Sequence, residues 1–278
     1  QKPYLTYHRV SKEGELVQSE EIDIPKPVMM HDWNITRNYV IFMDLPLVFD
    51  LDDAVSGSDP FGFKPECGAR LGVMPRNGSN SDIKWIEINP CFVFHPMNAY
   101  EENEKIILHV CRQNKAMVGG MDEIYGGEDT TGKIWKWTIN LTSGTCSEEQ
   151  IDDRPCDFAR VDDRLVGLKA KNGYAMALNE KAETLTFDQY LYKFDLENNK
   201  RFDHNLGDNV FGGEPVFVPK SGSLSEDDGW VMAIVYDANI DKSKLIIVDT
   251  ENFDKKPVGE IILPQRVPFG AHGSWLSN

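Results

Sequence analysis

The chain alternates short apolar segments with polar turns along its length. Hydrophobic runs such as residues 39–43 and 244–248 are about five residues long, whereas a membrane-spanning helix needs roughly 20. Strand-like patterns dominate, and the 3.6-residue period of an amphipathic helix is nearly absent. The pattern therefore predicts an all-β fold without a transmembrane segment.

Several predicted strands end at turns rich in Asn, Asp, Glu or Gly. Asn, Asp and Gly tolerate the left-handed backbone conformation that tight turns require. The strands followed by such turns are residues 4–9, 134–141, 190–196 and 244–249. Because a second short strand follows the turn, these segments predict antiparallel hairpins.

Five polar residues recur at a nearly constant spacing. His31, His95, Asp157, Glu214 and His272 are separated by 64, 62, 57 and 58 residues. A four-stranded propeller blade takes about 40–50 residues, and inserted loops would supply the surplus. The spacing favours a β-propeller whose blades point their first strands at a central axis. Coincidence among the many acidic residues is the alternative.

Composition narrows the classes of function. The chain has 278 residues, 41% of them hydrophobic, and a formal charge of −16. That charge repels a phosphate backbone, so nucleic acid is not expected as a partner. The five irregularly spaced cysteines are Cys67, Cys91, Cys111, Cys146 and Cys156. Their odd number favours reduced thiols over a disulfide framework, and with no visible secretory signal a cytoplasmic location is expected.

Three of the six histidines are candidate metal ligands. His31, His95 and His272 lie in turn-rich segments, and glycines close to His272 on both sides permit a close backbone approach. Imidazoles from distant points of a chain can bind Zn(II) or Fe(II), and the pattern does not choose between these ions. The other histidines are interpreted as ordinary strand or turn residues: His8, His109 and His204.

Two carboxylates share the spacing of these histidines. A metal-bound imidazole normally donates its other N–H to a carboxylate, which sets the tautomer and the ring orientation. Asp157 and Glu214 are candidates for this role. Glu214 is the better supported, because it lies in an apolar segment where an unpaired carboxylate is costly. A simple turn aspartate is the alternative for Asp157.

Five motifs in the chain resemble the carotenoid cleavage oxygenase family, which also includes the stilbene-cleaving dioxygenases and the vertebrate retinoid isomerase. They are MHDWNIT at residues 30–36, HPMNAYE at 95–101, DFARVD at 157–162, GEPVFVP at 213–219 and VPFGAHGSW at 267–275. They follow the family's order from one end of the chain to the other, which makes the resemblance specific.

The resemblance implies a seven-bladed β-propeller capped by loops. Residues 1–278 would form the C-terminal portion of that single domain, about five blades, with the N-terminal blades absent. It also implies one non-haem Fe(II) on the axis, held by four histidines. Three of these match His31, His95 and His272, and the fourth belongs to a motif upstream of this sequence. Orienting carboxylates match Asp157 and Glu214, and a third is expected upstream.

The activity that the resemblance implies is cleavage of a conjugated C=C bond of a carotenoid or apocarotenoid by O2, giving two carbonyl products. No protein acid or base is evident beyond the metal centre. Candidate lining for a long lipophilic substrate comprises Phe42, Phe61, Phe63 and Phe269, with an ordinary core role as the alternative for each. Such a substrate is compatible with peripheral membrane contact.

Two positions depart from the family's pattern. Asp157 stands where the family has Glu, so its reach toward a histidine is one methylene shorter. Ala271 replaces a larger residue beside the last histidine, which predicts a wider pocket there.

Three rival functions remain open. A stilbene or phenylpropanoid cleaver of the same family would use the same metal, because the selecting residues need not lie in this sequence. A non-catalytic propeller scaffold would bind no metal. A zinc hydrolase with a three-histidine site would hold zinc and act without O2.

Overall fold

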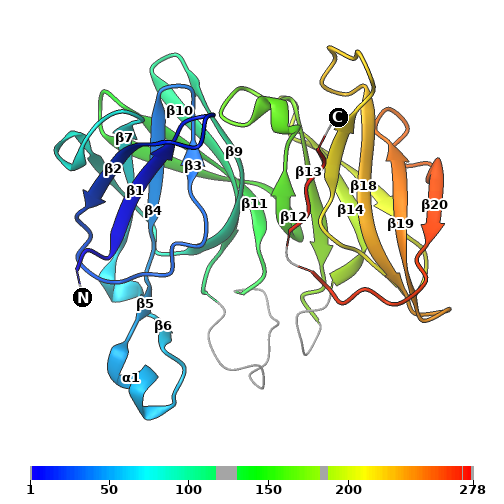
Figure 1. Ribbon diagram of the computed structural model, residues 1–278, viewed down its shortest axis with the longest axis horizontal. Helices are drawn as coiled ribbons and strands as arrows, with labels where there is room; N and C mark the ends of the chain where they lie inside the picture. The colour runs from blue at the N-terminus through cyan, green and yellow to red at the C-terminus, as the bar shows by residue number, and fades with distance from the viewer. Residues whose placement is uncertain (1, 117–129, 182–186, 271, 277–278) are drawn as a thin grey trace.

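Antiparallel sheets follow one another along the chain in the computed structural model, which describes residues 2–116, 130–181, 187–270 and 272–276 (Figure 1). We number five of these sheets as blades 1 to 5 in chain order. The prediction of an all-β fold is confirmed, and the sheets form part of a β-propeller. In the described part of the chain, no helix is long and apolar enough to cross a membrane.

Blades 1 and 2 come from the first third of the chain. Blade 1 is the hairpin of β1 (Leu5–Val10) and β2 (Leu16–Ile22). Blade 2 has the order β3 (Asn34–Ile35), β4 (Tyr39–Asp44), β7 (Ala69–Pro75) and β8 (Lys84–Ile88). An excursion between β4 and β7 contains β5 (Leu47–Phe49), α1 (Leu51–Ser56) and β6 (Phe61–Phe63). It hangs below blade 2 in Figure 1.

Blades 3 and 4 share one long strand. Blade 3 consists of β9 (Phe92–Glu102), β10 (Lys105–Gln113), β11 (Lys133–Asn140) and the first part of β12 (Thr145–Arg160). The rest of β12 begins blade 4, with β13 (Asn172–Leu178), β14 (Phe187–Asp195) and β15 (Lys200–Asn205). Because β12 pairs with β11 up to Pro155 and with β13 from Cys156, it leaves one blade's outer edge and becomes the next blade's inner strand.

Blade 5 is the last of the five numbered sheets in chain order. Both β16 (Val210–Phe211) and β17 (Val216–Pro219) pair with β18 (Gly229–Asp237), followed by β19 (Lys242–Asp249) and β20 (Gly259–Ile262). Short 3-10 helices span Pro65–Cys67, Asn80–Asp82 and Asp163–Leu165. The predicted hairpins are confirmed, and residues at their turns such as Gly14, Gly144 and Asn199 have positive φ values of 86°, 68° and 50°.

The core lies between neighbouring blades, where the facing sides of two sheets pack against each other. Successive side chains of a strand point to opposite faces. In β4, Val40 and Phe42 therefore join Tyr7 in the cluster between blades 1 and 2, whereas Ile41 and Met43 join the cluster between blades 2 and 3. Blade-on-blade packing of this kind leaves the inner strands to carry polar side chains toward the axis.

Candidate metal centre

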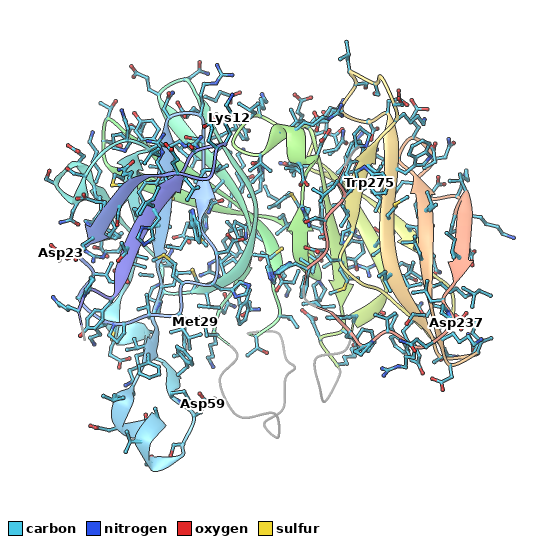
Figure 2. The ribbon with its side chains drawn as sticks, viewed as in Figure 1. Lys12, Asp23, Met29, Asp59, Asp237 and Trp275 are labelled. Carbon is cyan, nitrogen blue, oxygen red and sulfur yellow. The ribbon has the colours of Figure 1, made fainter. Side chains whose placement is uncertain are left out.

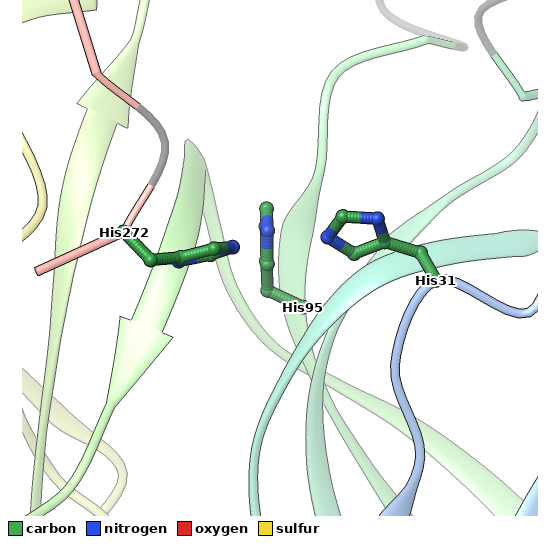
Figure 3. A group of neighbouring side chains, drawn as sticks. All are labelled: His31, His95 and His272. Atoms are coloured by element: carbon green, nitrogen blue, oxygen red, sulfur yellow. The ribbon is translucent and has the colours of Figure 1, made fainter.

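Three imidazoles from distant parts of the chain meet at one point. One ring nitrogen of each of His31, His95 and His272 lies within 4.8 Å of the others. Figure 3 shows the His95 ring between the other two, with His31 and His272 approaching from opposite sides. The ring centroids of His95 lie 5.1 Å from His31 and 4.9 Å from His272. The structure therefore brings together all three histidines that the sequence singled out.

The three histidines are supported differently. His31 lies in the segment between β2 and β3, and His272 lies in the segment after β20, outside any strand. His95, by contrast, is buried within β9. The expectation of a turn-rich context for His95 is wrong, since the strand continues through the adjacent Pro96. Pro96 lies at a register shift between β9 and β10. A proline is tolerated in a strand at such an irregularity.

The expected carboxylates contact two of the imidazoles. Nδ1 of His95 lies 2.8 Å from Oδ1 of Asp157, and Nδ1 of His272 lies 2.9 Å from Oε1 of Glu214. An ionised carboxylate can only accept, so each Nδ1 carries the proton and donates it. The Nε2 of both rings is then the nitrogen with a free lone pair, which is the arrangement that a metal-binding imidazole needs.

The shorter side chain of Asp157 still reaches His95, and the local backbone is unusual. The pairing of β12 with β13 shifts between Asp157 and Arg160, and Phe158 has a φ of 53°. A bulky residue in the left-handed region is uncommon and points to a constrained site. The N–H of Phe158 donates to Oδ1 of Asp157 at 2.8 Å, which places the carboxylate that accepts from His95.

Phe158 is itself a site residue that the sequence reasoning missed. Its ring stacks on His95 with centroids 4.4 Å apart and lies 5.5 Å from the ring of His272. The ring thus covers one side of the imidazole cluster with an apolar surface. Its position directly after Asp157 in the DFARVD motif was the only sequence signal for a role at the site. The residue type gave no indication of the positive φ that directs the ring toward His95.

The electrostatic environment differs among the histidines. Partial burial lowers the pKa of His31, and the nearby His95 adds to the effect. Burial also acts to lower the pKa of His95, but the hydrogen bond and charge of Asp157 outweigh it, so the pKa is raised. Asp32, which the sequence reasoning did not assign, faces the same cluster, and burial raises the pKa of its carboxyl group.

The donor set fits a divalent transition metal. Imidazole nitrogens suit Fe, Zn, Cu and Ni, whereas Mg and Ca prefer oxygen ligands. The three rings converge, and two of them have their tautomer set by a carboxylate. His31, His95 and His272 therefore fit Fe(II), although the same nitrogens would also accept Zn(II).

Two cavities adjoin the cluster. The three histidines line a cavity of about 510 Å³ together with Phe158 and Arg160. A second cavity of about 330 Å³, mostly apolar, lies between blade 5 and the segment that carries His272. Phe269 lines this second cavity and packs edge-on against Phe187, with centroids 5.0 Å apart. Its expected role in substrate binding stays a prediction.

The other predicted pocket residues lie elsewhere. Phe42 is 2% exposed and packs edge-on against Tyr7 in the core between blades 1 and 2. Phe61 and Phe63 lie on β6 in the excursion and pack against the core of blades 2 and 3. Figure 2 shows how far this excursion, marked by Asp59, lies from the C-terminal segment at Trp275.

None of Phe42, Phe61 and Phe63 lines either of these two cavities, so their expected role in substrate binding stays a prediction. The separate expectation of a wider space at Ala271 falls on a residue outside the described part of the chain.

Comparison with known proteins gives consistent matches over nearly the whole chain. The family model described as retinal pigment epithelial membrane protein matches residues 1–277. Carotenoid 9,10(9',10')-cleavage dioxygenase 1 of Phaseolus vulgaris is 33% identical over 293 residues, covering 99% of this chain and 53% of that protein.

Two solved structures share the fold closely. Cobalt-substituted ACO of Synechocystis is 28% identical with a TM-score of 0.88, covering 98% of this chain and 58% of that one. Lignostilbene dioxygenase of Pseudomonas brassicacearum is 25% identical with a TM-score of 0.88, covering 98% and 60%. The chain thus spans between half and about three-fifths of the length of these relatives.

Proposed function

The chain belongs to the retinal pigment epithelial membrane protein family, and on that premise we propose that it forms part of a non-haem Fe(II) dioxygenase. The proposed reaction is cleavage of a conjugated C=C bond of a carotenoid or apocarotenoid by O2, which gives two carbonyl products. The observation that carries the proposal is the convergence of His31, His95 and His272 within 4.8 Å, with carboxylates on the Nδ1 of two of them.

Each site residue has a role that follows from its contacts. His31, His95 and His272 would hold the iron through ring nitrogens. Asp157 and Glu214 accept hydrogen bonds from the Nδ1–H groups of His95 and His272, which leaves each Nε2 free to bind the metal and holds each ring in one orientation. Iron bound at these residues would provide the chemistry by which O2 reacts with the substrate. Because imidazoles are neutral, these two carboxylates are also the nearby negative charges that offset part of the charge of the ion.

The surroundings support a lipophilic substrate. The ring of Phe158 covers His95, which keeps water from that side of the cluster. The apolar cavity lined by Phe269 opens beside His272 and would accommodate a hydrocarbon chain. Such a substrate partitions into lipid, so peripheral membrane contact of a cytoplasmic enzyme is part of the same proposal.

The test uses the whole protein that carries this sequence. Iron-loaded protein would be incubated without O2 with a carotenoid, an apocarotenal or a hydroxystilbene, after which O2 is admitted and aldehydes are analysed. We expect stoichiometric iron and O2-dependent aldehyde formation from a carotenoid or apocarotenal. Zinc with O2-independent activity would instead indicate a hydrolase, and a folded protein that binds no metal would indicate a scaffold.

A second candidate substrate class rests on a specific observation. The lignostilbene dioxygenase matches this chain with the same TM-score, 0.88, as the Synechocystis ACO. The same metal and carboxylates would serve a stilbene cleaver. Aldehydes formed from the hydroxystilbene alone would favour this alternative over carotenoid cleavage.

A further inference from the structure

Within the described residues, no strand pairing beyond β20 attaches the segment that carries His272 to the propeller. At its start, the N–H of Leu263 donates to the carbonyl of Ser243 at 2.9 Å, and the N–H of Val267 donates to the Ser243 hydroxyl at 2.9 Å. Beyond Val267, the described residues 268–270 and 272–276 form no strand. Because strand pairing does not hold this part, side chains must place the imidazole.

Glu214 provides two of these attachments. Its Oε1 accepts from Nδ1 of His272 at 2.9 Å, and its Oε2 accepts from the N–H of Gly273 at 2.6 Å. The Glu214 side chain is only 7% exposed. Both carboxylate oxygens are thus committed to one dipeptide, and the orientation of the carboxylate determines where the imidazole points.

Arg160 completes the arrangement from the end of β12. Its Nη1 donates to the carbonyl of Gly273 and lies 3.5 Å from Oε1 of Glu214. Its Nη2 donates to Oδ1 of Asp163 at 3.0 Å, which anchors the guanidinium to blade 4. One planar group therefore contacts the backbone beside His272, the carboxylate that orients His272, and its own blade.

We propose that Arg160 is a positioning residue for His272. The guanidinium holds the carbonyl of Gly273 directly and, from 3.5 Å, helps to keep the carboxylate of Glu214 turned toward Nδ1 of His272. A fixed fork of donors suits this double task better than a single flexible ammonium group. The proposal rests on the proposed function only in assigning His272 as a metal ligand, because the contacts of Arg160 are a property of the polypeptide.

Co(II) titration followed by visible absorption tests the proposal in the whole protein that carries this sequence. Arg160→Met removes the guanidinium while keeping much of the side chain, and Arg160→Lys keeps the charge without the fork. Arg164→Met is the matched control, because Arg164 also pairs with a carboxylate, that of Asp162, and contacts neither Glu214 nor the His272 segment. Thermal unfolding of each variant reports on the fold.

We expect Co(II) affinity to fall about tenfold in Arg160→Met, as for loss of an outer partner of a metal ligand. Arg160→Lys should lie between this variant and wild type, and Arg164→Met should bind like wild type. In metal-free protein, amide hydrogen exchange of a peptide covering residues 267–276 should be faster in Arg160→Met than in wild type and Arg164→Met. A merely structural role would lower thermal stability without this pattern.

The proposal is overturned if Arg160→Met binds Co(II) as tightly as wild type, or if Arg164→Met loses the same affinity. Unchanged exchange of residues 267–276 in Arg160→Met also overturns it. A wild-type protein that binds no Co(II) contradicts the proposed function instead, and the exchange measurement on metal-free protein then decides the role of Arg160 alone.

Discussion

His95 and Asp157 both lie on strands and are both buried, whereas His272 and Glu214 both lie outside strands, with the His272 side chain 46% exposed. The two imidazole–carboxylate bonds are nevertheless almost equal, at 2.8 and 2.9 Å. The same chemical unit is therefore built twice, once inside a hydrogen-bonded sheet and once on a segment held by side chains.

The two bonds have nearly the same length although different kinds of contact hold their partners in place. Local opening costs least free energy where few backbone hydrogen bonds must break. The His95 pair lies on the paired strands β9 and β12, whereas the His272 pair depends on the contacts of Glu214 and Arg160. We call His95 with Asp157 the strand arm, and His272 with Glu214 the segment arm.

The largest effect is expected from removing a ligand of the strand arm. His95→Ala should weaken iron binding by more than about 100-fold, the upper end for loss of an outer partner, because a donor nitrogen itself is lost. The fold should persist, because the strand hydrogen bonds of β9 remain. Iron content and circular dichroism check this outcome. His8→Ala, at an exposed strand histidine, is the control, and full iron occupancy in His95→Ala would remove His95 from the ligand set.

A smaller and unequal effect is expected from neutralising the two carboxylates. Oδ1 of Asp157 accepts both of its site bonds, from His95 and from the N–H of Phe158. Asp157→Asn can keep both bonds through its remaining carbonyl oxygen. Glu214 uses one oxygen for His272 and the other for Gly273, so Glu214→Gln must leave one N–H facing its amide NH2 group.

Metal affinity should therefore fall further in Glu214→Gln, by about 10–100-fold, than in Asp157→Asn, where the loss should be about tenfold or less. Co(II) titration measures both. Hydrogen exchange of residues 267–276 should accelerate in Glu214→Gln only. Equal losses in the two variants would show that charge, rather than hydrogen-bond geometry, dominates both arms.

The smallest effect on the site is expected from His109, a buried histidine without a carboxylate. Neither ring nitrogen of His109 has a hydrogen-bond partner among the described residues, and burial lowers its pKa from 6.5 to about 4. Since the unfolded chain then binds more protons between these values, His109 should remove stability as the pH falls from about 6.5 toward 4, up to about 3 kcal/mol.

His109→Leu should reduce this acid sensitivity and leave metal binding unchanged. Denaturant unfolding at pH 7 and pH 5 checks the first expectation, and Co(II) titration checks the second. An unchanged pH dependence would mean that His109 finds a partner or water in solution. The contrast with His95, whose pKa is raised by Asp157, isolates what a carboxylate partner does for a buried imidazole.

Much of the site was predictable from the sequence because each blade repeats. The chain returns to the axis once per blade after nearly the same number of residues, either on an inner strand or beside one, so His31, His95 and His272 share a spacing with Asp157 and Glu214. The hairpins were predictable for a local reason, since Gly and Asn mark turns that need positive φ.

The lining of the two cavities was not predictable, because aromatic side chains occupy several different environments in this fold. Phe42 faces another blade, Phe61 packs on the core below it, and Phe269 lines a cavity. A phenylalanine in an apolar segment has the same sequence signature in all three environments, whether it lies in a strand, as Phe42 and Phe61 do, or outside one, as Phe269 does.

The amino-acid sequence by itself determined the strand pattern, the three imidazoles and the two carboxylates that meet them, because residue type and periodicity carry this information. Only the tertiary structure decided that the strand arm lies on paired strands, whereas the segment arm is held by the contacts of Arg160 and Glu214. It also decided that Phe158 turns its ring onto His95. These features depend on contacts between residues more than 50 positions apart and on a backbone irregularity in β12, which no local pattern encodes.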